Sequence, residues 1–186
     1  MSNTPRSRLL AALLSALLAG VLVVWLANLL ILDRPVNAAL TADSRNDGYT
    51  IRAHFDHYVV PGTLVLDLTA VESAAPVDVF RGLFQAADTL ASSGKQFEKV
   101  VLARNGKAVF IIPGDKFRNL GAAYGSGENS LYLLRTLPEQ LLEPDGSNAY
   151  GTWTGGVFGV FRQQMEDVND AARHWMNATE RLDDGL

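Results

Sequence analysis

The sequence predicts an α+β protein in which one N-terminal transmembrane helix is followed by a single domain of helices packed on a mixed β-sheet. The first observation behind this prediction is an uncharged, leucine-rich run from Leu9 to Leu32. The second is the apolar pattern of the later chain, which changes from alternation to spacings of three and four and back again. A three-layer α/β sandwich is the alternative fold.

The run from Leu9 to Leu32 has the length and composition of a membrane span. As a helix it measures roughly 36 Å, at about 1.5 Å per residue, whereas the hydrocarbon core of a bilayer is ~30 Å thick. Arg6 and Arg8 precede the run, and charges of both signs follow it. The positive-inside rule therefore places residues 1–8 in the cytoplasm and residues 33–186 on the outer side of the inner membrane. A cleaved signal peptide is the alternative, because residues 36–38 offer small side chains for cleavage.

Small residues follow one another at intervals of four in the first half of this helix, at Ala12, Ala16 and Gly20. They lie on one face, and small side chains let a second helix approach closely. The prediction is a packing face for another membrane protein or for a second copy of the chain. Alanine is also abundant in this sequence, so a face without a partner is the alternative.

Composition restricts the partners and the compartment. Removing the positive charges of Arg6 and Arg8 from the net charge of −4 leaves −6 for the outer part, which argues against nucleic acid as a partner. The chain has no cysteine, so disulfides and thiolate metal sites are excluded. A domain outside the membrane without cysteine is more usual in a bacterial envelope than in a eukaryotic secretory pathway.

The outer part divides into three segments by composition. Residues 33–48 have few large apolar side chains and are predicted to be a linker. Residues 49–178 are predicted to form one α+β domain with a single core. Residues 179–186 are predicted to be a flexible C-terminal tail.

The first half of the domain reads as two strands and a helix. Residues 49–60 and 63–71 are rich in β-branched and aromatic side chains, with a turn predicted at Pro61 and Gly62 between them. From Pro76 the apolar residues recur at three and four, which predicts a helix over 76–91.

A β-hairpin follows, with strands over 99–104 and 107–112. Asn105 and Gly106 between them favour the positive φ angles of a type I′ turn. The lengths of strand 63–71, helix 76–91 and strand 99–104 suit a crossover that joins two parallel strands.

The remaining chain is predicted to be mainly helical. Asp115 is expected to cap a short helix that Gly121 ends, and the segment 130–142 fits either a strand or a helix. An apolar stripe at helical spacing predicts a final helix over 157–178 that packs across the sheet.

Candidate functional residues are few. Tyr150 and Trp153 adjoin a glycine-rich run at 151–159, and if exposed they would offer an aromatic platform for a sugar or a protein. Asp115 at a strand-to-helix junction and Tyr124 beside a glycine-rich loop are further candidates. The histidines and the aspartate at 54–57 cannot all converge from one strand, so no metal and no cofactor is predicted.

The sequence therefore favours a single-pass, membrane-anchored binding or assembly module, an accessory subunit of a bacterial envelope complex. No motif for catalysis, metal or nucleotide binding supports an enzyme, and no motif identifies a family. The alternative is an envelope hydrolase acting on peptide or glycan, with Tyr124–Asn129 and Tyr150–Gly156 closing over a cleft.

Overall fold

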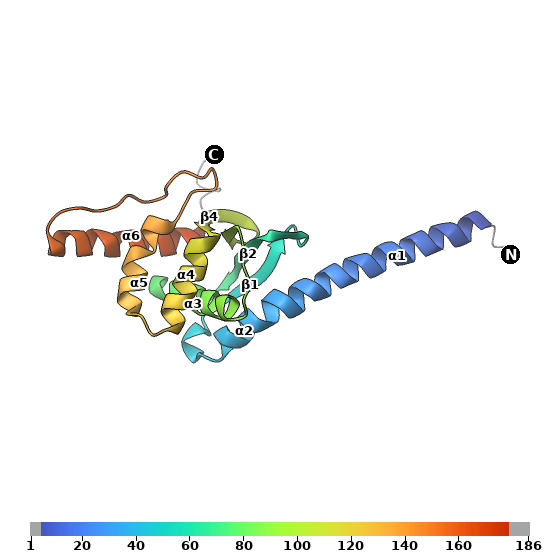
Figure 1. The fold of residues 1–186 in the computed structure, drawn as a ribbon, viewed down its shortest axis with the longest axis horizontal. Coiled ribbons are helices and arrows are strands. Elements are labelled where there is room, and N and C mark those ends of the chain that lie inside the picture. Colours follow the sequence, from blue (N-terminus) through green and yellow to red (C-terminus); the bar gives the residue numbers. More distant parts are fainter. Residues whose placement is uncertain (1–4, 179–186) are drawn as a thin grey trace.

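The structure, a computed structural model, describes residues 5–178, without the side chains of residues 5–9, 11, 157 and 158. The predicted C-terminal tail and the first four residues of the predicted cytoplasmic tail lie outside the described residues. Within the described residues the fold is α+β, and one long apolar helix is followed along the chain by a domain with a four-stranded mixed sheet (Figure 1). The predicted α+β class and the mixed sheet are confirmed.

The elements follow one another in chain order. They are α1 (Pro5–Asn28), the π-helical turn η1 (Leu29–Asp33), α2 (Arg34–Thr41), the 3-10 turn η2 (Ser44–Asn46), β1 (Tyr49–Asp56), β2 (Val60–Val71), α3 (Pro76–Ser92), β3 (Lys99–Arg104), β4 (Lys107–Pro113), α4 (Gly114–Gly125), α5 (Ser130–Thr136), the 3-10 turn η3 (Pro138–Gln140) and α6 (Val157–Asn177).

The strands lie in the order β1-β2-β3-β4. The α3 crossover joins β2 to β3 in parallel, as predicted, and the other two pairs are antiparallel. Asn105 and Gly106 form the predicted turn between β3 and β4, with φ of 50° and 79°. Because β2 and β3 run in parallel, the β1–β2 turn and the β3–β4 turn lie at opposite ends of the sheet.

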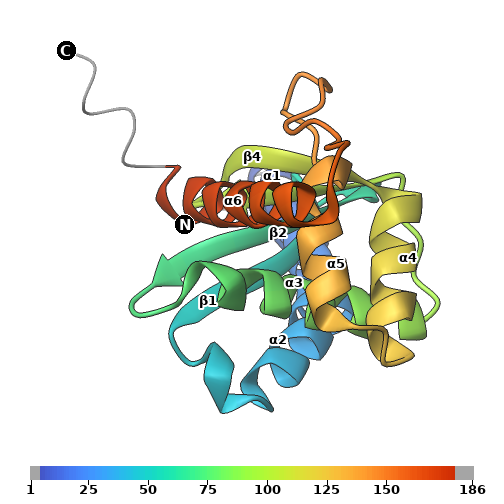
Figure 2. The same cartoon turned by 90° about the vertical axis from the view of Figure 1, so that its left-hand side faces the viewer.

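Helices α3 and α6 pack on one side of the sheet (Figure 2). The fully buried Trp175 of α6 stacks with Phe80 of α3 at 6.1 Å between ring centroids, and its indole N–H donates to the Ala103 carbonyl of β3 at 2.8 Å. Burial of one large apolar side chain contributes about 1.5–3 kcal/mol, and the hydrogen bond satisfies the only polar atom of this ring. Trp175 thus joins three elements in the core.

Two predictions about α4 are wrong. The helix begins at Gly114 with Pro113 as its N-cap, and Asp115 lies exposed in the first turn. Gly121 lies inside the helix, because the absence of a side chain there lets α4 approach the Ala87 carbonyl of α3. Close helix packing here outweighs the low helix propensity of glycine.

The first hairpin turn also differs from its prediction. It lies at His57 and Tyr58, and β2 already begins at Val60, which pairs with Asp56. Pro61 precedes Thr63, the first β2 residue that pairs with β3, so no bond of that ladder is lost at the proline. The ambiguous segment 130–142 forms α5 and η3.

Residues 33–48, predicted to be a linker, fold onto the domain. Leu32, Val36 and Leu40 are buried with exposures of 0, 0 and 5%, and belong to the same core as the sheet. Their spacing of four places three apolar side chains on one helical face, which is enough to dock α2 although the segment is polar overall. One continuous helical arm therefore runs from Pro5 to Thr41, and its last turns are part of the domain.

Candidate functional site at the helix–sheet junction

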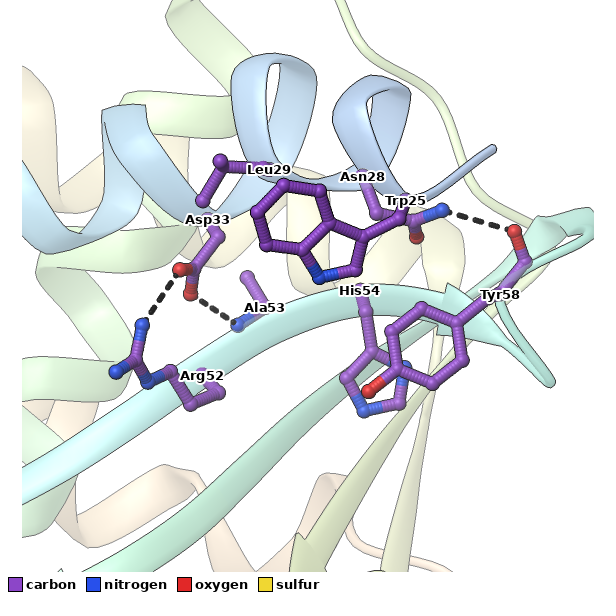
Figure 3. A pocket seen from close by; sticks show the side chains of 8 residues that line it. All are labelled: Trp25, Asn28, Leu29, Asp33, Arg52, Ala53, His54 and Tyr58. Atoms are coloured by element: carbon purple, nitrogen blue, oxygen red, sulfur yellow. Dashed lines mark hydrogen bonds and ion pairs between the residues drawn. The ribbon is translucent and has the colours of Figure 1, made fainter. Parts of the chain in front are cut away.

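A crevice of about 330 Å³ lies where the helical arm crosses β1 (Figure 3). The arm contributes four residues to it, and β1 with its following turn contributes four more. These are Trp25, Asn28, Leu29 and Asp33 from the arm, and Arg52, Ala53, His54 and Tyr58 from the hairpin. The crevice thus lies at the carboxyl end of the apolar helix, where the chain enters its folded domain.

The π-helical turn η1 aims two side chains at β1. Residues five apart on an α-helix point about 140° away from each other, since each residue turns about 100°. In η1 the Arg34 N–H bonds to the Leu29 carbonyl, five residues earlier, and this wider turn brings Asn28 and Asp33 to the same side. Such turns are frequent at functional sites.

Asn28 and Asp33 cover the free edge of β1. The Asn28 side-chain oxygen accepts from the Phe55 N–H at 2.7 Å, and one Asp33 oxygen accepts from the Ala53 N–H at 3.2 Å. Five helical residues rise by at most about 7.5 Å, which matches the ~6.8 Å between alternate residues of a strand. The arm therefore satisfies edge donors that would otherwise be open to pairing with another strand.

Asn28 also fixes the hairpin turn. Its side-chain amide donates to the Tyr58 carbonyl at 2.8 Å and to the Val24 carbonyl at 2.9 Å, and its side chain is almost fully buried. The His54 and Tyr58 rings stack at 4.5 Å between centroids. The position of the turn beside α1 is thus determined by specific contacts.

The charged side chains of the crevice are bonded within the protein. The second Asp33 oxygen accepts from the Arg52 guanidinium at 2.9 Å, and His54 Nδ1 lies 2.8 Å from the Phe55 carbonyl. Trp25 and Tyr58 are 52% and 48% exposed and form its rim. Paired charges and exposed rings suit binding more than proton transfer.

A second polar cluster fixes the end of the arm to α3. The buried Asn46 amide donates to the Leu40 carbonyl at 2.9 Å and to the Gln85 side chain at 2.6 Å. The Tyr49 hydroxyl donates to Asn46 at 2.7 Å, and burial raises the pKa of Tyr49. The bonds of Asn46 to the Leu40 carbonyl and to Gln85 join the end of the arm to α3.

Asp43 and Arg81 extend this cluster on its exposed side. The Arg45 guanidinium donates to both Asp43 oxygens, at 2.9 and 2.7 Å, and this holds the pKa of Asp43 below its usual value. Arg81 pairs with Asp78 at 2.7 Å and donates to the Arg45 carbonyl. Both ends of the segment between α2 and β1 are therefore bound to the domain.

Tyr150 and Trp153 are held on α6. The Tyr150 hydroxyl donates to Asp170 at 2.8 Å, and burial together with this carboxylate raises the pKa of Tyr150. The Trp153 indole N–H donates to Asp167 at 2.6 Å, and the ring is 38% exposed. The loop before α6 is thus attached to that helix by two aromatic side chains.

The other predicted site residues lie elsewhere. Tyr124 packs its ring 5.8 Å from that of Phe84 and lines a hollow of about 350 Å³ together with Leu131 and Leu134. Asp115 is at the other end of α4 and exposed. The four residues are therefore not gathered at one place.

A larger groove, of about 620 Å³, lies between α4, α5 and the loop before α6. Its walls combine charged, amide, hydroxyl and aromatic side chains, among them Lys116, Asn119, Tyr132, Thr136 and Glu139. Mixed polar and aromatic walls are typical of a surface that recognises a protein or a polar ligand.

The small-residue face of α1 is exposed along the arm, at Ala12, Ala16 and Gly20. Gly20 faces the β1–β2 turn across a further crevice of about 580 Å³. In the described part of the chain, no group of three or more His, Asp or Glu side chains is placed to hold a metal ion.

Sequence reasoning missed the junction. Its one available signal was Asn28, a carboxamide inside an otherwise apolar run, with Asp33 five residues later. A search with models of protein families, a search of curated proteins and a search of solved structures each find no significant match.

Proposed function

We propose that this chain is a single-pass membrane protein of a bacterial inner membrane, with its N-terminus in the cytoplasm, whose outer domain binds and assembles an envelope complex as an accessory subunit. The observation that supports it best is the helical arm. Its apolar stretch is almost entirely unburied within the protein, with Leu17 at 67% exposure. An apolar surface of this extent needs a bilayer around it.

The junction favours a retained anchor over a cleaved signal peptide. Cleavage after Ala38 would remove Leu32 and Val36 from the core, together with the side chains of Asn28 and Asp33 that cover the β1 edge. A signal peptide is removed from the mature protein, so its residues do not form part of the core of the mature domain. This argument supports a membrane-attached domain in a fixed orientation.

The groove between α4 and α5 is the surface proposed to bind the partner. It lies on the folded domain and carries both cationic and anionic groups, at Lys116 and Glu139. Because the arm is rigid, this groove is held at a fixed height above the membrane. A fixed orientation is valuable for assembly with other membrane subunits.

The orientation can be tested in cells because the chain has no cysteine of its own. A Ser126→Cys variant, exposed at the end of α4, is expected to react with a membrane-impermeant maleimide in intact spheroplasts. A Ser2→Cys variant is expected to react only after lysis. The reverse pattern would contradict the orientation, and recovery of both variants in the soluble fraction would contradict the anchor.

The binding role needs a separate test. A photo-crosslinking amino acid at Asn119 in the groove is expected to give a discrete adduct, whereas the same residue at Arg173, exposed on α6, is expected to give none. A chain with residues 9–24 replaced by leucine, which keeps Trp25 and the junction, shows whether the span contributes. Equal labelling at both positions, or no adduct in the groove, would contradict the proposal.

A further inference from the structure

We propose that the β1–β2 turn, residues 57–60, enters the outer interface of the bilayer, and that the crevice between this turn and α1 holds an acyl chain of an outer-leaflet phospholipid. This inference rests on the membrane anchor proposed above. It gives the domain a second contact with the membrane, in addition to the span.

The depth of the turn follows from counting along α1. A hydrocarbon core of ~30 Å requires about 20 helical residues, so a core that starts at Leu9, next to Arg8, ends near Asn28. The crevice is lined on the helix side by residues between Leu17 and Trp25, all within that stretch. Figure 1 shows the β1–β2 turn directed along α1 toward its N-terminal half. The turn therefore lies at the level of the membrane boundary or below it.

The chemistry of the crevice suits an acyl chain. Its volume is about 580 Å³ and its walls are mainly apolar: Leu17, Gly20, Val21, Val24, Trp25, His57, Tyr58 and Val59. Tyr58, Val59 and Val60 are 48, 63 and 41% exposed in the absence of a membrane. Aromatic residues such as Trp25 and Tyr58 are enriched at the headgroup level of bilayers.

Three backbone groups of the turn have partners within the protein, which lowers the cost of placing them in the membrane. The Tyr58 and Val59 N–H groups donate to the Phe55 and Asp56 carbonyls at 2.8 and 3.1 Å, and the Tyr58 carbonyl accepts from Asn28. The Asp56 carboxylate and the His57 ring lie 3.8 Å from each other. Entry into the interface thus leaves none of these backbone groups without a partner.

The two hairpin turns of the sheet differ in the residue types that adopt positive φ. At the far end, Asn105 and Gly106 adopt positive φ easily. At the other end, His57 and Tyr58 adopt φ of 48° and 64°, which histidine visits more often than most residues but which is unfavourable for a bulky tyrosine. Asn28 and His54 hold Tyr58 in this conformation, and it leaves the Tyr58 ring 48% exposed beside α1.

Lipid is the occupant that the position favours. A chain that crosses a bilayer once is surrounded by acyl chains at the level of Leu17 to Trp25, so a hollow beside the span fills with lipid unless a protein displaces it. Gly20 contributes to the hollow, since apart from its chain neighbours and the backbone of its own helix no atom lies within 4 Å of the side-chain position at this residue.

The test uses the full chain in vesicles of phosphatidylethanolamine and phosphatidylglycerol. A nitrobenzoxadiazole label is placed on Val59→Cys at the turn or on Lys107→Cys at the opposite end of the sheet, both exposed positions. Dithionite, an anion that does not enter the bilayer, is expected to reduce the label at 59 about tenfold more slowly than the label at 107. Spin-labelled phospholipid is expected to quench only the label at 59.

Gly20→Leu tests the acyl chain itself. Filling the crevice is expected to weaken lipid quenching at position 59, whereas Ala16→Leu, outside the crevice lining, is expected to leave it unchanged. Equal reduction rates at 59 and 107 would overturn the membrane contact. Protection at 59 without quenching by lipid would mean that a second copy occupies the crevice, and would overturn the lipid assignment. Failure of the protein to float with vesicles would instead refute the anchor, so the two failures are distinguishable.

Discussion

Replacing Asn28 with leucine is expected to destabilise the protein, although leucine suits an apolar helix better than asparagine. The substitution removes the acceptor of the Phe55 N–H and the donor to the Tyr58 carbonyl, at 2.7 and 2.8 Å. A buried polar group left without a partner costs about 1–3 kcal/mol. Leucine recovers about 0.5 kcal/mol of helix propensity. Since the turn is partly accessible to water, the net loss is expected to be about 2–4 kcal/mol.

The matched control is Asn169→Leu on α6. Asn169 makes the same bond to the carbonyl four residues earlier, at 2.9 Å, as Asn28 does to Val24, and it is exposed. It therefore shares the intrahelical bond of Asn28 but has no bond to the sheet in the described structure. Any difference between the two variants reports the contacts with β1 and the turn.

Two measurements on the full chain in detergent test this prediction. Denaturant unfolding gives the free energy difference, and amide hydrogen exchange gives its location. Exchange at Phe55 is expected to accelerate strongly in Asn28→Leu, while Ala53, whose N–H donates to Asp33, is expected to keep its protection. Equal protection of Phe55 in the wild type and the variant, with an unchanged free energy of unfolding, would refute the junction.

Three further predictions concern packing, pH and topology. Gly121→Ala is expected to lower the free energy of unfolding by about 1–3 kcal/mol, because the added methyl group meets the α3 backbone. Gly159→Ala, in an open part of α6, is expected to raise the free energy of unfolding by up to about 1 kcal/mol. Denaturant titration measures both variants, and equal effects would contradict the packing of α4 on α3. Burial raises the pKa of Tyr49, so as the pH rises the unfolded chain loses the hydroxyl proton first, and stability is expected to fall above about pH 10. In thermal melts, Tyr49→Phe is expected to reduce the loss of stability with rising pH. An identical pH dependence in the wild type and the variant would contradict this role of Tyr49. Replacing Arg6 and Arg8 with Glu is expected to weaken or invert the topology, as read by protease accessibility of the domain, and unchanged accessibility would contradict the charge argument.

The pairing of β2 with β3 and of β3 with β4 could be predicted because it depends on local signals. Asn105 and Gly106 determine their own turn, and the change of period at Pro76 marks the crossover helix. These features need no knowledge of distant residues. The first hairpin turn could not be predicted in this way, because His57 and Tyr58 adopt positive φ against their local preference. Contacts with Asn28 and His54 hold that turn, and they arise only in the folded chain.

The candidate site could not be predicted for a related reason. Asn28 and Asp33 lie five apart, and on a regular α-helix they would not face the same strand. Only the π turn at Leu29–Asp33 brings them together, and a π turn has no simple sequence pattern. The docking of α2 was predictable in principle, because Leu32, Val36 and Leu40 repeat at four. Residues 33–48 are polar on average, and their composition therefore predicted a linker although the apolar residues are spaced as on one helical face.

The continuity of the arm has a consequence for assembly. A flexible linker would let the domain rotate freely about its anchor, so that a partner bound to the span and a partner bound to the groove would place no constraint on each other. Here the helix continues into the core, and the face of α1 that carries Ala12 and Ala16 keeps one angle to the groove between α4 and α5. A membrane helix packed on that face would determine which molecule could reach the groove. The rigid junction thus couples two surfaces that a tethered domain would leave independent.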